Sequence, residues 1–123
     1  MKRAELKALT MEALIERYRA TSAKHGHATD ESKPKVANNA FDDLAALRKE
    51  LRSRGAEGWQ SLRSLLHDPE PGTRYWAATF LLDFVPVEAE SVLRELAGIP
   101  KSLVGFSAEM ALEQWKAGTF RPA

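Results

Sequence analysis

No cysteine occurs among the 123 residues of the chain. This absence excludes disulfide bonds, a thiol nucleophile, and every zinc or iron–sulfur site that needs cysteine ligands. No apolar run approaches the roughly 18 residues that a membrane-spanning helix needs. The N-terminal segment contains basic side chains but no apolar stretch, because Glu5 and Lys7 interrupt it, so it does not indicate a secretion signal. We therefore expect a cytoplasmic protein that does not enter a membrane.

A strong charge imbalance is also missing, since the formal net charge is +1. Such a balance lacks the electrostatic footprint of nucleic-acid binding, which depends on an excess of lysine and arginine. What the chain does have is apolar content, because hydrophobic residues make up 44% of the sequence. At this length, that content suffices for one domain with a single core, without support from a metal or a disulfide.

β-Branched residues are few, and this scarcity favours helices. The chain has 19 alanines and 15 leucines but only five valines and two isoleucines. Alanine and leucine lose little freedom in a helix, whereas β-branched residues favour pleated strands. No stretch shows the regular alternation of a half-buried strand, and no Asn-Gly or Asp-Gly hairpin turn occurs. The sequence therefore predicts an all-α fold.

Apolar spacing, glycine and proline divide the chain into about six predicted helices. Thr10 is the predicted N-cap of the first helix, Gly26 is expected to end or fray it, and a polar linker follows over 28–33. The second helix starts near Pro34 and stops before Gly55. The remaining helices are expected at 59–66, at 73–84, from Pro86 to Gly98, and from Ser102 to Gly118. They form one domain with an N-terminal helix pair over 10–55 and two repeat-like pairs over 57–84 and 86–118.

The third and fourth predicted helices resemble a HEAT-like helical repeat. The matching residues are, in order, Asp68-Pro69-Glu70-Pro71, Arg74, Ala77-Ala78 and Leu81-Leu82. A partial second copy follows 33 residues later with Ser107, Met110-Ala111 and Gln114-Trp115. The resemblance implies a right-handed α–α superhelix, a HEAT-like solenoid, in which Asp68 caps the second helix or bonds turn amides. It also implies that Arg74 reaches back to turn carbonyls and that paired alanines let the helices approach closely.

The whole chain is also similar to a small bacterial family of uncharacterised single-domain HEAT-like proteins. The similarity includes residues 50–55 (Glu-Leu-Arg-Ser-Arg-Gly) and the closing residues 118–122 (Gly-Thr-Phe-Arg-Pro). It implies no catalytic residues and no cofactor, so none are assigned. It is compatible with an adaptor role or with a neutralising, immunity-like role in a bacterium.

The fourth predicted helix carries the residues most typical of a binding surface. In a HEAT-like arrangement, Ala77, Ala78 and Leu81 point into the core. Five other residues of this helix then face outward on the concave side, namely Tyr75, Trp76, Thr79, Phe80 and Asp83. Because tryptophan and tyrosine are enriched at binding hot spots, we expect this face to bind a protein partner or a second copy of the chain. The alternative is that the first two helices, or a second copy, cover the patch.

A basic cluster on the second predicted helix offers an alternative function, the binding of a nucleic-acid backbone. Its members are Arg48, Lys49, Arg52 and Arg54. Residues 1–57 hold 12 basic and 9 acidic residues, whereas residues 58–123 hold 6 and 8. This asymmetry is small, and basic residues late in a helix also suit the helix dipole. We therefore expect a solvated helix face here rather than a nucleic-acid site.

Histidines provide the remaining candidates for chemistry. His25 and His27 lie two residues apart near two acidic side chains, but such a spacing diverges on a helix, whereas metal ligands on one face are four residues apart. We therefore expect no metal site. His67 and Asp68 could serve as an acid–base pair, but Asp68 already has a role in the turn. With neither a Gly-x-Ser-x-Gly motif nor a glycine-rich phosphate loop, the sequence predicts a protein that is not an enzyme.

Overall fold

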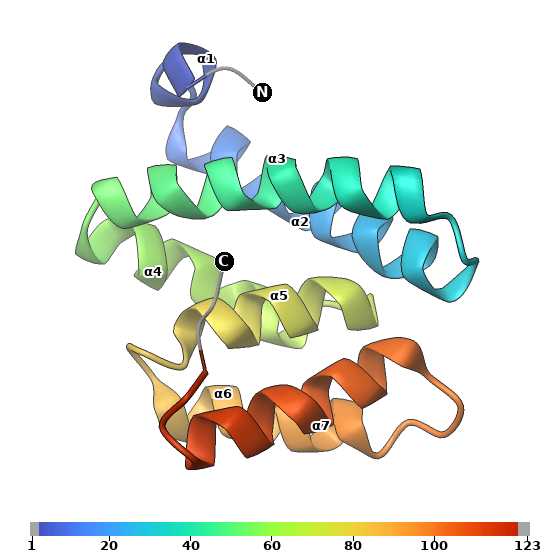
Figure 1. Ribbon diagram of the computed structural model, residues 1–123. Coiled ribbons are helices and arrows are strands. Elements are labelled where there is room, and N and C mark those ends of the chain that lie inside the picture. Colours follow the sequence, from blue (N-terminus) through green and yellow to red (C-terminus); the bar gives the residue numbers. More distant parts are fainter. Residues whose placement is uncertain (1–2, 121–123) are drawn as a thin grey trace.

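The computed structural model of the protein describes residues 3–120, which form helices joined by short turns (Figure 1). The helices are α1 (Arg3–Lys7), α2 (Met11–Asp30), α3 (Pro34–Ser53), α4 (Ala56–Leu62), the 3-10 helix η1 (Arg63–His67), α5 (Pro71–Leu81), α6 (Pro86–Ala97) and α7 (Leu103–Lys116). Residues 3–120 contain no strand, so the all-α prediction is confirmed. Within this range, no helix is both long and apolar enough to cross a membrane. Arg121 and Pro122, which belong to the family resemblance, lie outside the described residues.

Three differences separate these helices from the predicted ones. The short helix α1 is additional to the predicted set. The third predicted helix is divided into α4 and η1, and α5 both begins and ends earlier than expected. The other predicted helices are present, and the structure differs there in bounds rather than in type.

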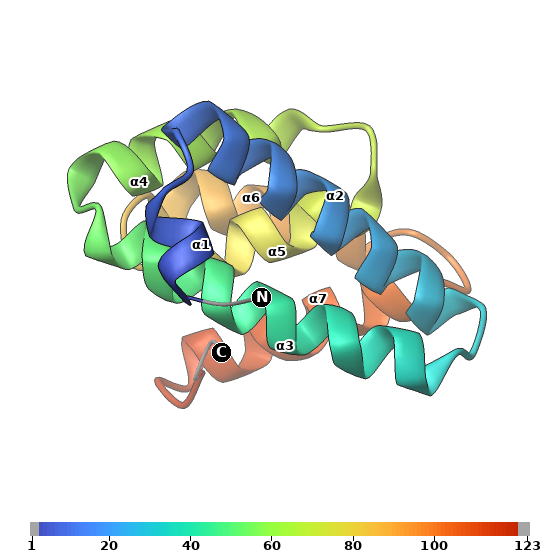
Figure 2. The same ribbon diagram turned by 90° about the horizontal axis from the view of Figure 1, so that it is seen from above.

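The helices pack in successive pairs around a central helix. α2 packs along α3, η1 packs against α5, and α6 packs along α7. Seen from above, α2, α4 and α6 lie on one side, α3 and α7 lie on the other, and α5 lies between them (Figure 2). α5 contacts α2, α4, α6 and α7 in addition to η1, so most of the other helices surround it. The division of the chain into repeat-like pairs and the right-handed superhelix both stay predictions.

Local sequence signals determine where several helices begin. Thr10 Oγ1 accepts a hydrogen bond at 3.1 Å from the backbone N–H three residues further along, and Ser102 Oγ accepts the equivalent bond at 3.0 Å. Each side chain thereby satisfies an N–H group that has no partner within the helix. Pro34, Pro71 and Pro86 occupy first helical positions, where no N–H is needed. The predicted caps at Thr10 and Ser102 are confirmed.

The expected end of the first long helix at Gly26 is wrong, because α2 continues to Asp30. Gly26 is buried where α2 crosses the start of α5, and a Cβ atom added to it would lie 3.0 Å from the Gly72 Cα. A Cβ atom added to Gly72 would lie 2.8 Å from the backbone oxygen of Ser22. The two glycines therefore permit a close approach of two helices rather than ending one. The predicted linker is correspondingly shorter, and Ser32, with φ of 56°, forms its corner.

The turn before α5 agrees only in part with the repeat resemblance. Asp68 Oδ2 accepts a hydrogen bond at 3.1 Å from the Glu70 N–H, as expected of a side chain that bonds turn amides. Arg74 differs, because its Nη1 lies 3.8 Å from the carboxylate of Glu95 on α6, and its buried Nε has no hydrogen-bond partner. The expected contact of Arg74 with the turn carbonyls is therefore replaced by a long ion pair with the next helix.

One continuous core joins the helices, and it contains polar side chains as well as leucines. The buried polar and charged residues are Ser22, Arg48, Glu50, Thr73 and Thr79. At the α2–α5 crossing, Thr73 Oγ1 donates to the Arg19 carbonyl at 3.1 Å, and Ser22 Oγ donates to the Tyr18 carbonyl at 2.7 Å. These buried hydroxyls therefore have partners, as buried polar groups generally require.

We expect the substitution Gly72→Ala to lower the free energy of unfolding by about 1–3 kcal/mol, the range for overpacked cores. The added Cβ would lie 2.8 Å from a backbone oxygen of α2, so two backbones must move apart. Chemical denaturation followed by circular dichroism measures the effect.

The matched control is Gly98→Ala. There the added Cβ would lie 3.4 Å from its nearest contact, and φ is −80°. This substitution should change the free energy of unfolding by less than about 0.5 kcal/mol. Equal effects of the two substitutions would contradict the close approach of α2 and α5 at Gly72.

Candidate functional site

The residues predicted to bind a partner lie on α5, and the structure buries most of them. Trp76 is 6% exposed, Thr79 is 3% exposed and Phe80 is fully buried. Tyr75 is half-buried, and Asp83, just after α5, is exposed. The expectation that these residues face outward as an aromatic binding surface is therefore wrong for Trp76, Thr79 and Phe80.

Side chains of α2 and α3 cover the two aromatic rings. The Arg48 guanidinium carbon lies 5.4 Å from the centroid of the Trp76 ring and 5.6 Å from that of Phe80. Arg52 lies over the same Phe80 ring at 5.1 Å. The His25 ring packs edge-on against Trp76 at 5.1 Å. The alternative left open by the sequence, that the first two helices cover the patch, is thus the correct one.

A polar network under these rings connects α2, α3 and α5. Arg48 Nη1 donates to Thr79 Oγ1 at 3.1 Å, and Thr79 Oγ1 donates to the Trp76 carbonyl at 3.2 Å. The Tyr18 hydroxyl donates to the same carbonyl at 2.7 Å. Burial raises the pKa of Tyr18 to about 12, so the hydroxyl keeps the proton that it donates. Nothing in the apolar spacing of the sequence predicts this network.

Arg48 is fully buried, and the prediction that it lies on a solvated basic face is wrong. Burial also lowers the pKa of its guanidinium, because the charged form loses its hydration. Two of its nitrogens, Nε and Nη2, have no hydrogen-bond partner. Its position late in α3, on the same side as the buried Leu44, Leu47 and Leu51, is the sequence signal that could have indicated burial.

The other three basic residues do not form a common phosphate site with Arg48. Arg54 Nε donates to Glu50 at 2.9 Å, and its Nη2 donates to the carbonyls of Leu6 and Leu9 at 2.9 and 2.8 Å. Arg54 therefore satisfies carbonyls at the end of α1 and holds that helix on α3. Lys49 and Arg52 are exposed. The predicted cluster thus divides into one buried, one structurally engaged and two exposed side chains.

The two neighbouring histidines contact different helices. His25 Nδ1 accepts a hydrogen bond from Trp76 Nε1 at 3.3 Å, whereas His27 Nε2 lies 3.0 Å from the Glu70 carboxylate. Burial lowers the pKa of His25. Within residues 3–120, no group of three or more histidine, aspartate or glutamate side chains is arranged to hold a metal ion.

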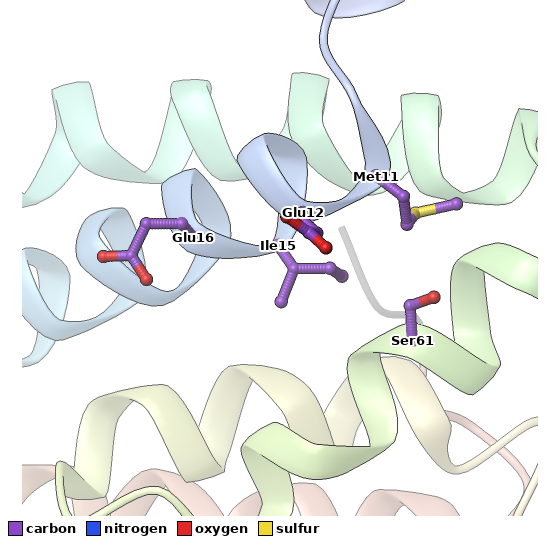
Figure 3. A pocket seen from close by; sticks show the side chains of 5 residues that line it. All are labelled: Met11, Glu12, Ile15, Glu16 and Ser61. Atoms are coloured by element: carbon purple, nitrogen blue, oxygen red, sulfur yellow. The ribbon is translucent and has the colours of Figure 1, made fainter.

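Two larger pockets are described, and His67 is the one predicted candidate residue that lines either of them. A pocket of about 390 Å³ opens between the start of α2 and α4, lined by Met11, Glu12, Ile15, Glu16 and Ser61 (Figure 3). Figure 3 shows the Glu16 carboxylate turned away from Ser61 on the facing helix. Arg19 binds that carboxylate and holds the pKa of Glu16 below its usual range. Glu16 is therefore not placed to act as a base on the Ser61 hydroxyl.

A second pocket, of about 380 Å³, lies between η1 and α6. It is lined by Leu66, His67, Val87, Glu88, Ser91, Val92 and Glu95. Arg63 Nε donates to Glu88 at 3.0 Å and holds the pKa of this carboxyl below its usual range. His67 lines this pocket, whereas its neighbour Asp68 is engaged in the turn before α5. That the protein is not an enzyme stays a prediction.

The clearest exposed apolar surface lies on α7. Leu103, Phe106 and Met110 are 47%, 59% and 43% exposed. Their spacing of three and four residues places them on one face of the helix, opposite the buried Ala108 and Leu112. We call these three residues the α7 stripe. Sequence reasoning missed it as a surface, because the same spacing equally describes a buried face.

Comparisons with known proteins agree with this fold and indicate no activity. A family model described as a domain of unknown function (DUF2019) matches residues 12–116. The crystal structure of the protein RPA1889 from Rhodopseudomonas palustris is similar, with a TM-score of 0.86 and 24% sequence identity over 96% of this chain and 98% of that chain. At this identity, the likeness concerns the fold alone. No curated protein matches significantly.

We expect Phe80→Ala to lower the free energy of unfolding by about 3–5 kcal/mol, as for other phenylalanines removed from a core. The ring is fully buried and supports two arginine side chains. The control Phe106→Ala removes a ring that is 59% exposed, and its effect should be much smaller. Urea denaturation of both variants measures the difference. Similar effects would contradict the burial of Phe80.

We expect His25 to make the protein less stable in mild acid. Its folded pKa lies below the ordinary value of 6.5, so the unfolded chain takes up the proton first as the pH falls. Protonation of Nδ1 would also remove the acceptor of the Trp76 indole N–H. The stability present above pH 6.5 should therefore decrease below that value, as measured by the melting temperature down to about pH 5.

The variant His25→Gln should lose this component of the pH dependence, because glutamine does not titrate. The control His27→Gln should keep it, since His27 is exposed and does not contact Trp76 through a hydrogen bond. An unchanged pH profile in His25→Gln would show that His25 does not cause the effect.

Proposed function

The chain belongs to the DUF2019 family, a domain of unknown function, and from this premise we propose that it acts as a non-enzymatic module that binds another protein. The observation that carries the proposal is the α7 stripe, in which three large apolar side chains are each at least 43% exposed. Contiguous apolar side chains on a surface are typical of interaction sites. The buried face of α5 has no such role in this proposal.

The position of the stripe in the fold supports this function. We interpret the three helix pairs as HEAT-like repeats that follow one another in a superhelix. In such arrays, each pair covers the apolar face of its neighbour, and the last pair normally has a polar outer face. α7 belongs to the last described pair and instead carries apolar side chains opposite its core face. A binding partner would cover these exposed side chains.

The charges beside the stripe indicate the chemistry of the partner. Glu109 and Glu113 lie next to Phe106 and Met110 on the same exposed part of α7. A surface with apolar anchors and neighbouring lysine or arginine side chains would complement this arrangement, and charge complementarity of this kind favours a specific partner. We therefore propose a different protein with a basic, apolar surface rather than a second copy of this chain. An adaptor or neutralising role in the cytoplasm is part of the proposal.

We do not propose that the protein binds nucleic acid. Arg48 is fully buried, and Arg54 is engaged with α1, so two of the four residues proposed for phosphate contacts do not face a nucleic-acid backbone at the surface.

The proposal is tested by capturing partners from the host lysate with the wild-type protein and with the double variant Phe106→Asp, Met110→Asp. Quantitative mass spectrometry should show at least a tenfold loss of the specifically captured protein in this variant, because two apolar anchors that the partner would bury become charged. The charge-reversed double variant Glu109→Lys, Glu113→Lys should also lose it. The control Val87→Asp should retain it, since Val87 is 77% exposed but lies on α6.

Equal capture by the wild type and the stripe variant would overturn the proposed surface. Sedimentation analysis of the purified protein provides the second readout. A dimer that Phe106→Asp dissociates would show that the stripe joins two copies of this chain, and it would overturn the proposal of a different partner.

A further inference from the structure

Two arginine side chains elsewhere in this protein, Arg19 and Arg63, hold carboxylates in the same bidentate way. Arg19 Nε donates to Glu16 at 2.8 Å, and its Nη2 donates to the other oxygen of the same carboxylate. Arg63 binds Glu88 in the same manner, with an Nε distance of 3.0 Å. In both pairs, the edge of the guanidinium that carries Nε and Nη2 binds the two carboxylate oxygens. This bidentate arrangement is the strongest geometry available to an arginine side chain.

The same edge of Arg48 has no partner. Nη1 donates to Thr79, but Nε and Nη2, the two donors of the bidentate edge, are buried without a hydrogen bond. No carboxylate forms an ion pair with Arg48 in the part of the chain that the structure describes. A buried charge with unsatisfied donors is unfavourable, because neither water nor an opposite charge replaces its lost hydration. Arg48 therefore has both an unmet hydrogen-bonding capacity and an uncompensated charge.

The surroundings of Arg48 favour a negatively charged group. Two cations lie over the Phe80 ring, with Arg48 at 5.6 Å and Arg52 at 5.1 Å from its centroid. Arg52 is exposed, so the pair extends from the solvent to the interior. Charges within such apolar walls interact more strongly than they do in water. Both guanidinium groups thus contribute a positive potential beside the Phe80 ring.

We propose that the Nε–Nη2 edge of Arg48 is a binding site for a carboxylate, with Arg52 as the outer cation that meets the ligand first. Two coplanar oxygens match the two parallel N–H donors of this edge, and one negative charge matches the one buried positive charge. A phosphate monoester carries more charge than the buried guanidinium neutralises, so it fits less well. The carboxylate enters when α3 and α5 separate locally at Phe80, and it closes the network that ends at Thr79. This site is independent of the α7 stripe.

Thermal unfolding at neutral pH and constant ionic strength tests the site, with sodium acetate, inorganic phosphate or sodium chloride as the added salt. We expect acetate to raise the melting temperature of the wild-type protein by about 5 °C at ten times its dissociation constant, relative to chloride. Arg48→Met should abolish this rise, and Arg52→Gln should reduce it. Lys49→Gln is the matched control, because it removes an exposed neighbouring cation and should leave the rise unchanged.

A second measurement uses only the wild-type protein, so it remains decisive if Arg48→Met does not fold. The NMR signal of the Arg48 Nε–H should shift on addition of acetate and not on addition of chloride. The absence of this shift, or an equal acetate effect in Arg48→Met, overturns the site. A larger effect of phosphate than of acetate overturns the choice of a carboxylate.

The source of the carboxylate is distinguished with a blocked tripeptide, N-acetyl-Gly-Glu-Gly-amide, and its glutamine counterpart. Stabilisation by the glutamate peptide but not by the glutamine peptide identifies an acidic protein side chain as the ligand. Stabilisation by acetate without an effect of either peptide identifies a small organic acid.

Discussion

The side chain of Arg48 connects α3 to the helix at the centre of the protein. Its guanidinium stacks on Trp76 and Phe80 and donates to Thr79, all three on α5. The Trp76 carbonyl accepts from Thr79 and also from Tyr18 of α2, so a single turn of α5 is bound to two other helices. Hydrogen bonds require defined directions, whereas apolar packing alone does not. The network therefore sets the rotation of α5 and directs its aromatic side toward α3.

This rotation determines which apolar side chains the fold buries and which it leaves exposed. α5 lies between the other helices and buries its aromatic residues, so these residues add little to the exposed apolar surface. α7 is covered on one side only, and its outer side carries the α7 stripe. Binding another protein at the α7 stripe would therefore bury apolar side chains that the described fold leaves exposed.

Several side chains are of types that are common in catalytic or binding sites, but in this fold they make structural contacts. Arg54 holds the end of α1, His25 accepts from the Trp76 indole, and Asp68 bonds the turn before α5. Each of these contacts satisfies a polar group that would otherwise be buried or left at a helix end without a partner. Arg48 and Arg74 keep buried donors without a hydrogen bond, one on Arg74 and two on Arg48. The two adjacent donors of Arg48 form the proposed carboxylate site.

The amino-acid sequence by itself determined the helices, because their signals are local. Alanine and leucine content excluded strands, Thr10 and Ser102 marked helix starts, and prolines stood at first helical positions.

Only the tertiary structure decided which side of each helix is covered. α5 is apolar around most of its circumference, so its spacing of apolar residues could not distinguish a binding face from a face packed on α3. For the same reason Gly26 indicated a helix end, although the backbone of α5 passes close to it, and Arg48 indicated solvent, although aromatic rings of another helix enclose it. Such contacts join residues far apart in the chain, and no local pattern contains them.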